Sequence, residues 1–241
     1  MPIWKPYNHT IDFVKGAMLS KPAKVYLLSL AERNSLDMWI NEELRKGYIQ
    51  PSTSPIAAPF FFVKKHNGSL QSVIDYRALN RITIKNRCLI PRIADLIESL
   101  SKALIFTKID LRWGYNNVHI KEGDEWKTAS ITKQGLFEAT FMYFSFSNTS
   151  VIFQSMMNNI LGNLIHIRLV MVYLDDILIF GTCLKEHRQL VKKVLKRFQF
   201  NDLYTKAENC FFEQSSINYL GVIISENKVQ MDEEKLSEVL E

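Results

Sequence analysis

Apolar residues recur at helical spacing in several segments of the chain. From Asn34 or Ser35, the segment SLDMWINEELRKGY places apolar residues every three or four positions, opens with a capping residue and stops near Gly47. This pattern predicts a short amphipathic helix. The same spacing predicts three more helices, in residues 91–103, 153–165 and 187–200. Residues 1–35 show no clean period and carry three prolines, which predicts an extended leader packed on the surface.

Other apolar runs predict strands. Residues 58–77 form two β-rich runs around a polar turn at His66, Asn67 and Gly68, which is typical of a hairpin with a basic tip. The run LIFTKIDL predicts a strand ending near Asp110, VMVYLDDILIFG predicts a buried hairpin, and INYLGVIIS predicts one further strand. Helices and strands mix without an internal repeat. The expected fold class is therefore α+β, with an antiparallel sheet covered by helices.

Composition narrows the class of protein only slightly. Of the 241 residues, 47% are hydrophobic and 12% aromatic, enough to bury the core of one large domain or two packed lobes. The net charge of +5 suits a polyanionic partner without proving one. Three widely spaced cysteines disfavour a disulfide scaffold or a zinc pair, and indicate a reducing compartment. With no signal peptide and no uninterrupted apolar span, we expect an intracellular protein, in cytoplasm or nucleus, with no membrane partner.

Two adjacent acids, Asp175 and Asp176, interrupt the predicted buried hairpin. A buried carboxylate without a partner would be costly, so something must compensate these charges. A bound Mg²⁺ would do so because it takes hard oxygen ligands, and a solvent-facing turn, the commoner setting for an isolated Asp-Asp pair, would do so equally well. Since neighbouring strand residues face opposite sides, the two acids would play different roles, and Asp175 is expected to be the better metal ligand.

A second source of carboxylate is needed if two ions are to be held. Asp110 ends the apolar run LIFTKIDL and is the candidate with a matching position at the end of a strand. The residue could equally terminate the strand or cap a helix. The three acids together predict a site for divalent cations only if the fold brings them to one place.

Five segments resemble, in order and spacing, the reverse transcriptase of Ty3/gypsy-type LTR retrotransposons. They are SPIAAPFFFVKKHNGSLQSVIDYRALNRITIKN, FTKIDLRWGY, IKEGDEWKTA, YLDDILIF and NYLGVIIS. The most specific signal is the joint occurrence of YLDD, VIDYRALN and GDEWKTA. The resemblance covers essentially the whole chain. It implies a right-hand polymerase fold and an RNA-directed DNA polymerase that extends a primer with deoxynucleotides by two-metal-ion nucleotidyl transfer.

The resemblance also implies how the chain is divided. After the leader at 1–35, it implies fingers at 36–84 and 118–148, a palm at 85–117 and 149–225, and the start of a thumb or connection at 226–241. The palm would contain the antiparallel sheet covered by helices, and the thumb would be truncated or partial. Expected partners are an RNA or DNA template-primer, deoxynucleoside triphosphates, and the RNase H, integrase and protease domains of a polyprotein.

The resemblance assigns roles to eleven residues. The catalytic and metal-binding acids would be Asp110, Asp175 and Asp176, holding two Mg²⁺ or Mn²⁺ ions. The nucleotide-binding residues would be Lys65, Gln71, Tyr115, Phe144 and Gln154, and the primer grip would be Tyr219, Leu220 and Gly221. Taken without the resemblance, Lys65 is a solvated charge at a hairpin tip, Tyr115 is a core residue, and Gly221 marks an edge or bulge.

Several positions depart from the family pattern. The family usually carries Arg where this chain has Gln71, so a triphosphate contact has lost its charge. Its Pro-Phe-Gly appears as residues 143–145 and its Asn-Ala-Pro as residues 148–150, with loss of one glycine and two prolines. These changes leave open a catalytically weakened retroelement remnant that binds template-primer without efficient synthesis. A structural domain that binds no nucleic acid would need the acids to be surface turns.

Overall fold

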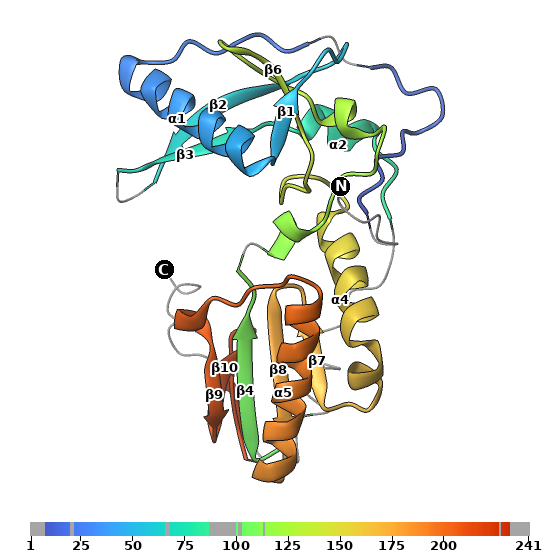
Figure 1. Ribbon diagram of the computed structural model, residues 1–241, viewed down its shortest axis with the longest axis vertical. Helices are drawn as coiled ribbons and strands as arrows, with labels where there is room; N and C mark the ends of the chain where they lie inside the picture. Colours follow the sequence, from blue (N-terminus) through green and yellow to red (C-terminus); the bar gives the residue numbers. More distant parts are fainter. Residues whose placement is uncertain are drawn as a thin grey trace. The chain divides into compact units, whose positions relative to one another are not determined.

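The computed structural model describes residues 8–19, 22–65, 68–86, 100, 103–112, 114–226 and 228–231 (Figure 1). The chain divides into two compact units. The first comprises Met1–Arg87 and Tyr115–Ile152, and the second comprises Cys88–Gly114 and Phe153–Glu241. Each unit combines strands with helices, so the expected α+β class is confirmed.

The first unit is built on a five-stranded sheet with the strand order β1-β6-β5-β2-β3. Its strands are β1 (Ile49–Pro51), β2 (Ala58–Lys64), β3 (Leu70–Ile74), β5 (Ser130–Thr132) and β6 (Gly135–Ala139). Its helices are α1 (Leu30–Lys46), α2 (Arg77–Ile82) and the 3-10 helix η2 (Glu125–Thr128), and the 3-10 helix η1 (Gly114–Asn117) starts at the boundary. The predicted hairpin is confirmed as β2 and β3, which pair antiparallel. Only the β2–β5 pair is parallel among the described strands.

Helix α1 begins earlier than the hydrophobic spacing indicated. The predicted start at Asn34 or Ser35 is wrong because Ser29 and Glu32 form a capping box ahead of it. The Glu32 carboxylate accepts a hydrogen bond from the Ser29 backbone N–H at 2.7 Å. The predicted end is confirmed, since Gly47 adopts a left-handed φ of 72° as the C-cap. Leader residues 30–35 are therefore helical.

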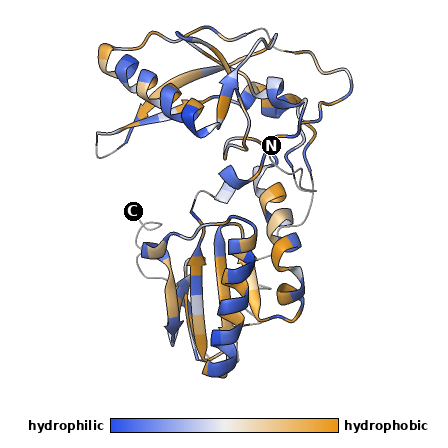
Figure 2. Cartoon of the chain, viewed as in Figure 1, coloured by the Kyte–Doolittle hydropathy of each residue, from blue (hydrophilic) through white to orange (hydrophobic). Residues whose placement is uncertain are grey.

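The second unit is built on a four-stranded antiparallel sheet with the strand order β7-β8-β4-β9. The strands are β4 (Ile105–Asp110), β7 (Val170–Tyr173), β8 (Asp176–Gly181) and β9 (Phe211–Gln214). Helix α5 (Leu184–Phe200) lies across β8 and β4 (Figure 1). Figure 2 shows hydrophilic colour on the outer face of α5 and hydrophobic colour on the strands behind it. The helices predicted at 153–165 and 187–200 are confirmed as α4 (Thr149–His166) and α5.

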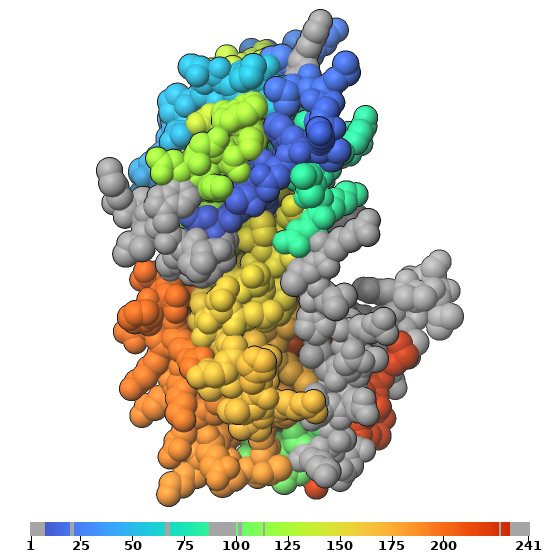
Figure 3. All heavy atoms as spheres, turned by 90° about the vertical axis from the view of Figure 1, so that its right-hand side faces the viewer, coloured from blue at the N-terminus to red at the C-terminus, as the bar shows by residue number. Residues whose placement is uncertain are grey.

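One buried apolar cluster of the second unit lies between its four-stranded sheet and a small three-stranded sheet. That second sheet contains β10 (Ser216–Tyr219), β11 (Val222–Ser225) and β12 (Lys228–Met231), and the 3-10 helix η3 (Ala207–Asn209) precedes β9. Phe106, Leu178 and Tyr219 are fully buried in one apolar cluster. On α4, polar residues such as Asn158 and Asn159 remain exposed, and this helix forms part of the surface seen in Figure 3.

The single strand predicted for INYLGVIIS is wrong, because the segment folds into two strands. Leu220 and Gly221 both have positive φ angles, 53° and 83°, which make a tight turn between β10 and β11. Tyr219 pairs with Val222 across that turn. An apolar run does not reveal such a reversal, and Gly221 was the only local signal for it.

Some predictions concern residues outside the described part of the chain. They include the hairpin tip at His66 and Asn67, most of the helix expected at 91–103, and most of 226–241. Cys183 and Cys210 are free thiols. No helix in the described ranges combines the length and apolar character that crossing a membrane requires.

Candidate active site

Asp110 and Asp176 lie directly opposite each other on adjacent strands. Strand β4 ends at Asp110, β8 begins at Asp176, and the two residues are register partners in the antiparallel pair. Side chains of directly opposed residues project from the same face of a sheet. Two acids separated by more than sixty positions in the sequence are therefore placed side by side at one end of the sheet.

The third acid, Asp175, lies in the turn between β7 and β8. Tyr173 pairs with Asp176, so Leu174 and Asp175 form a two-residue connection. Leu174 has a φ of 55°, a left-handed conformation that a leucine adopts only at an energetic cost. The surrounding structure must hold this turn in place.

Gln154 holds the turn from helix α4. Its side chain is 3% exposed. The amide nitrogen donates a hydrogen bond to the Val172 carbonyl at 3.1 Å, and the amide oxygen accepts one from the Leu174 N–H at 3.0 Å. These bonds lie on both sides of Tyr173, immediately before the two acids. The Gln154 side chain, which was expected to line the nucleotide, thus makes hydrogen bonds to the backbone of the hairpin.

Gly114 allows the backbone of η1 to approach Asp175. A Cβ atom at this position would lie 2.9 Å from the Phe153 ring and 3.2 Å from Asp175 Oδ1. Phe153 is fully buried, as expected for a core residue. Any side chain at position 114 would therefore displace the ring or the carboxylate. Sequence reasoning missed this role, although the glycine is part of the quoted FTKIDLRWGY segment.

Polar partners hold the carboxylates of both strands. Lys108 lies two residues before Asp110 on β4, and its Nζ is 2.9 Å from Asp176 Oδ1. Asn209, in η3, donates a hydrogen bond from Nδ2 to Asp110 Oδ2 at 2.6 Å. Both contacts are partly exposed, which leaves the acids accessible to a ligand. Neither Lys108 nor Asn209 was identified from the sequence.

The donor set fits a divalent cation that is shared with a substrate. In the described ranges, no three His, Cys, Asp or Glu side chains converge into a ready-made metal cage. Mg²⁺ does not require such a cage, because it is usually held by one or two carboxylates together with waters and substrate phosphates. Asp110, Asp175 and Asp176 supply hard oxygen ligands at neighbouring strand ends. Their chemistry therefore suits Mg²⁺ or Mn²⁺.

An open hollow of about 560 Å³ adjoins the strand end at Asp110. Arg112 and Lys206 are among the residues that line it. The Lys206 backbone N–H donates to the Asp110 carbonyl at 2.9 Å, which fixes this loop against β4. The lining also includes the acidic Glu208, so it is the two cationic side chains, rather than the hollow as a whole, that suit phosphate groups.

Four of the expected nucleotide residues belong to the first unit. Lys65 and Gln71 are exposed on the β2–β3 hairpin, where Gln71 pairs with Val63. The rings of Tyr115 and Phe144 meet edge to face, with centroids 5.3 Å apart. Phe144 is 71% exposed, so it is available to a ligand.

The expected primer-grip residues differ in accessibility. Tyr219 is fully buried, and its hydroxyl donates to the Asp176 backbone carbonyl at 3.3 Å. Burial raises the pKa of the Tyr219 phenol well above its ordinary value. Tyr219 therefore supports the backbone of Asp176, one of the candidate acids, whereas the Leu220–Gly221 turn is only partly buried.

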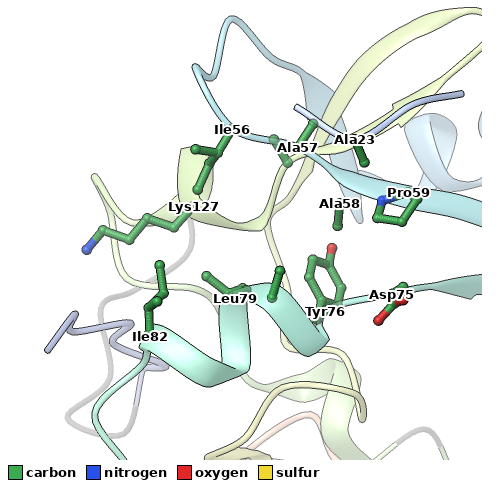
Figure 4. Close-up of a pocket in the computed structure, with 12 residues that line it drawn as sticks. Ala23, Ile56, Ala57, Ala58, Pro59, Asp75, Tyr76, Leu79, Ile82 and Lys127 are labelled. Carbon is green, nitrogen blue, oxygen red and sulfur yellow. The ribbon is translucent and has the colours of Figure 1, made fainter. Parts of the chain in front are cut away.

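A separate cavity of about 110 Å³ lies within the first unit (Figure 4). Its lining is mainly apolar and includes Ile56, Leu79 and Ile82. The Tyr76 hydroxyl at its edge donates to the Thr128 carbonyl at 2.7 Å. The cavity contains none of the three acids, so it is not the candidate active site.

The family model for reverse transcriptase (RNA-dependent DNA polymerase) matches residues 63–224. The chain belongs to this family. Among similar proteins, the Transposon Tf2-3 polyprotein of Schizosaccharomyces pombe is 33% identical over 220 residues, covering 91% of this chain and 16% of that protein. The Retrovirus-related Pol polyprotein from transposon 297 of Drosophila melanogaster is 33% identical over 241 residues, covering 97% and 23%. The reverse transcriptase chain thus spans about a fifth of these relatives, and the expected retrotransposon resemblance is confirmed.

Solved structures confirm the expected polymerase fold of this reverse transcriptase domain. The foamy viral protease-reverse transcriptase in complex with RNA/DNA hybrid has a TM-score of 0.81 at 20% identity, covering 96% of this chain and 31% of that one. The complex of the foamy viral enzyme with dsDNA has a TM-score of 0.83 at 21% identity, covering 97% and 48%. At these identities the likeness establishes the fold alone.

Proposed function

We propose that this reverse transcriptase domain is an active RNA-directed DNA polymerase that extends a primer with deoxynucleotides. The observation that carries the proposal is the register pairing of Asp110 with Asp176, with Asp175 in the adjoining turn. This arrangement gathers three carboxylates at one end of the second unit's sheet. Such a set of oxygen donors suits two-metal nucleotidyl transfer.

Asp110 and Asp175 would hold the two divalent ions, with Asp176 beside them. When bound, Mg²⁺ or Mn²⁺ would lower the pKa of the primer 3′-hydroxyl and neutralise charge on the triphosphate. The protein's own contribution is to fix the position of its carboxylates. Gln154 fixes the turn that bears Asp175, while Lys108 and Asn209 orient the carboxylates of Asp176 and Asp110.

We assign the first unit to the fingers and the second to the palm. The boundaries of the units, after residues 87, 114 and 152, lie close to those implied by the sequence resemblance. The assignment gives the fingers the exposed hairpin with Lys65 and Gln71, and gives the palm the three acids. Residues from 226 onward would begin a thumb or connection.

Phosphate contacts would account for most of the affinity for nucleic acid. The foamy viral relatives were solved with an RNA/DNA hybrid and with dsDNA, and this chain has a net charge of +5. Arg112 and Lys206 border the hollow beside Asp110 and would meet phosphates. The Leu220–Gly221 turn would contact the primer end, with Tyr219 buried behind it.

Nucleotide binding would use the exposed residues of the first unit. Lys65 would contact the triphosphate as a point charge, with Gln71 as a neutral donor nearby. Tyr115 and Phe144 already form an aromatic pair on which a nucleotide could pack. We further propose that RNase H, integrase and protease domains belong to the same polyprotein, which acts inside the cell in cytoplasm or nucleus.

A weakened remnant is the second candidate, and Gln71 favours it. This exposed residue lacks the positive charge that the family pattern places there. Such a protein would retain salt-sensitive binding of template-primer, because phosphate contacts do not need catalysis.

Primer extension on a primed RNA template, with Mg²⁺ or Mn²⁺, separates the two candidates. An Asp175→Asn variant, compared in folding by circular dichroism, serves as the control. Extension by the wild type that is lost in Asp175→Asn supports a working polymerase. Undiminished extension by the variant would contradict the assigned role of Asp175, and retained binding without extension in the wild type would favour the remnant.

A further inference from the structure

The loop at residues 143–148 presents Phe144 outward and anchors its other aromatic inward. Phe144 is 71% exposed and meets Tyr115, whereas Phe146 is 5% exposed and packs on Tyr76 at a centroid distance of 4.5 Å. Since the loop lacks the glycine and prolines expected from the family pattern, other contacts must hold its shape.

Asn80 of helix α2 spans the loop with its side-chain amide. Its Nδ2 donates to the Ser145 carbonyl at 2.8 Å. Its Oδ1 accepts from the Ser147 backbone N–H at 2.9 Å and from the Ser147 hydroxyl at 3.1 Å. One amide therefore satisfies backbone groups on both sides of Phe146 and ties them together.

Thr149 holds the start of the same loop. Its hydroxyl donates to the Tyr143 carbonyl at 2.8 Å, and its side chain is buried at 1% exposure. The same carbonyl accepts the Phe146 N–H at 3.3 Å, closing a turn with Phe144 and Ser145 at its centre. The family pattern has alanine here, which could not make the bond. The hydroxyl thus supplies a constraint at the point where the rigid residues are missing.

We propose that Asn80 and Thr149 are positioning residues that hold this loop so that Phe144 can pack against the incoming nucleotide. The inference rests on the proposed function, since it assigns a purpose to the exposed face of Phe144. It also explains how a loop without the family's glycine and prolines keeps a defined nucleotide-facing surface. Asn148 reinforces the arrangement by donating to the Ile84 carbonyl at 2.9 Å and accepting from the Asn86 N–H at 3.0 Å.

The first test measures the loop itself in the whole chain. Asn80→Ala removes the whole side-chain amide and Thr149→Val replaces only the hydroxyl by a methyl group, so both lose the hydrogen bonds, while Thr149→Ser keeps the hydroxyl. Amide hydrogen exchange across residues 143–149 is expected to be faster in Asn80→Ala and Thr149→Val. It should be unchanged in Thr149→Ser and in Asn159→Ala, where the lost bond lies within an exposed turn of α4. Unchanged exchange in both loop variants would overturn the inference, whether or not the chain polymerises.

The second test measures the nucleotide. In primer extension, Asn80→Ala and Thr149→Val are expected to raise the KM for deoxynucleotides by about tenfold with kcat nearly unchanged, as the loss of one or two neutral hydrogen bonds predicts. Faster exchange with an unchanged KM would overturn the positioning role. If the wild type extends no primer, the proposed function fails. In that case the measured quantity is the deoxynucleotide concentration that gives half of the full stabilisation of the template-primer complex in Ca²⁺. If this concentration is the same in the wild type and the variants, the inference is overturned.

Discussion

The backbone N–H of Leu174 donates a hydrogen bond to the buried side chain of Gln154, at 3.0 Å, in the turn that carries Asp175. Leu174 has a positive φ of 55°, so the turn is held in a conformation that leucine disfavours. Tertiary contact with helix α4, rather than local preference, therefore determines where the acid lies.

Replacing Gln154 by Leu should weaken both stability and catalysis. The change leaves the Val172 carbonyl and the Leu174 N–H without their partner, which costs about 1–3 kcal/mol for each buried group. We expect a lower free energy of unfolding in urea, and extension reduced by at least about tenfold because Asp175 is no longer fixed. Primer extension by Gln154→Leu at the rate of the wild type would contradict this role.

Gly114→Ala should remove activity by steric displacement. The new methyl group would lie 2.9 Å from the Phe153 ring and 3.2 Å from Asp175 Oδ1, both closer than ordinary contacts. Extension should fall by at least about tenfold, since small misplacements of catalytic groups are costly. Gly162→Ala is the matched control, because nothing lies within 4 Å of its Cβ position in α4. That variant should stabilise the chain by about 0.5–1 kcal/mol in thermal unfolding.

Lys108→Met should change the metal requirement. The Lys108 ammonium lies 2.9 Å from Asp176 and would compete with a divalent cation for that carboxylate. Removing this charge should lower the Mg²⁺ concentration that gives the half-maximal thermal shift by about two- to fivefold. A change of this size corresponds to the free energy of one partly exposed ion pair. Thermal shift against Mg²⁺ measures the effect without catalysis, and Lys108→Arg should behave like the wild type. A higher Mg²⁺ requirement would exclude competition as the role of Lys108.

Gln71→Arg should improve nucleotide binding. Gln71 is exposed beside the hairpin tip, and an arginine there would add a forked, permanent cation for the triphosphate. The expected gain is about 1.5–3 kcal/mol, seen as a lower apparent KM for deoxynucleotides in primer extension. Gln71→Glu should raise that KM. An unchanged or higher KM in Gln71→Arg would count against a triphosphate contact at this position.

His9 should make stability dependent on pH. Its side chain is 1% exposed, and burial lowers the pKa of the imidazole to about 4, with Asp124 opposing the shift. The unfolded chain therefore binds the proton more readily, so stability is greatest above about pH 6.5 and falls by roughly 3 kcal/mol as the pH drops toward 4. Urea unfolding from pH 7.5 to 4 should show this slope, and His9→Phe should reduce it. An identical slope in that variant would mean that other groups cause it.

The local sequence pattern was sufficient to predict the strands that carry the three candidate acids. Strand β4 and the β7–β8 hairpin follow directly from continuous apolar runs, and the acids stand out because they interrupt or end those runs. The capping box at Ser29 and Glu32 could also be recognised in the sequence, since Ser-x-x-Glu is a helix-start signal. The prediction placed the start later because it relied on the apolar spacing that begins further along the chain.

Short strands and reversals were less predictable. Strands β1, β5 and β6 have three to five residues each and are stabilised by pairing with one another and with β2. Their sequences contain no strong alternation, so pairing rather than propensity determines them. The β10–β11 turn could not be recognised from the sequence because it lies inside a single apolar run.

The sequence by itself determined the fold class and the family and pointed to the three candidate acids, because these depend on hydrophobic spacing and on motifs of adjacent residues. Only the tertiary structure decided that Asp110 lies opposite Asp176, that the Gln154 side chain bonds to the backbone of the hairpin, and that Gly114 must lack a side chain. Each of these facts depends on strand register or on close approach between segments distant in sequence. Neither is encoded in local propensity, since both arise only when the segments pack together.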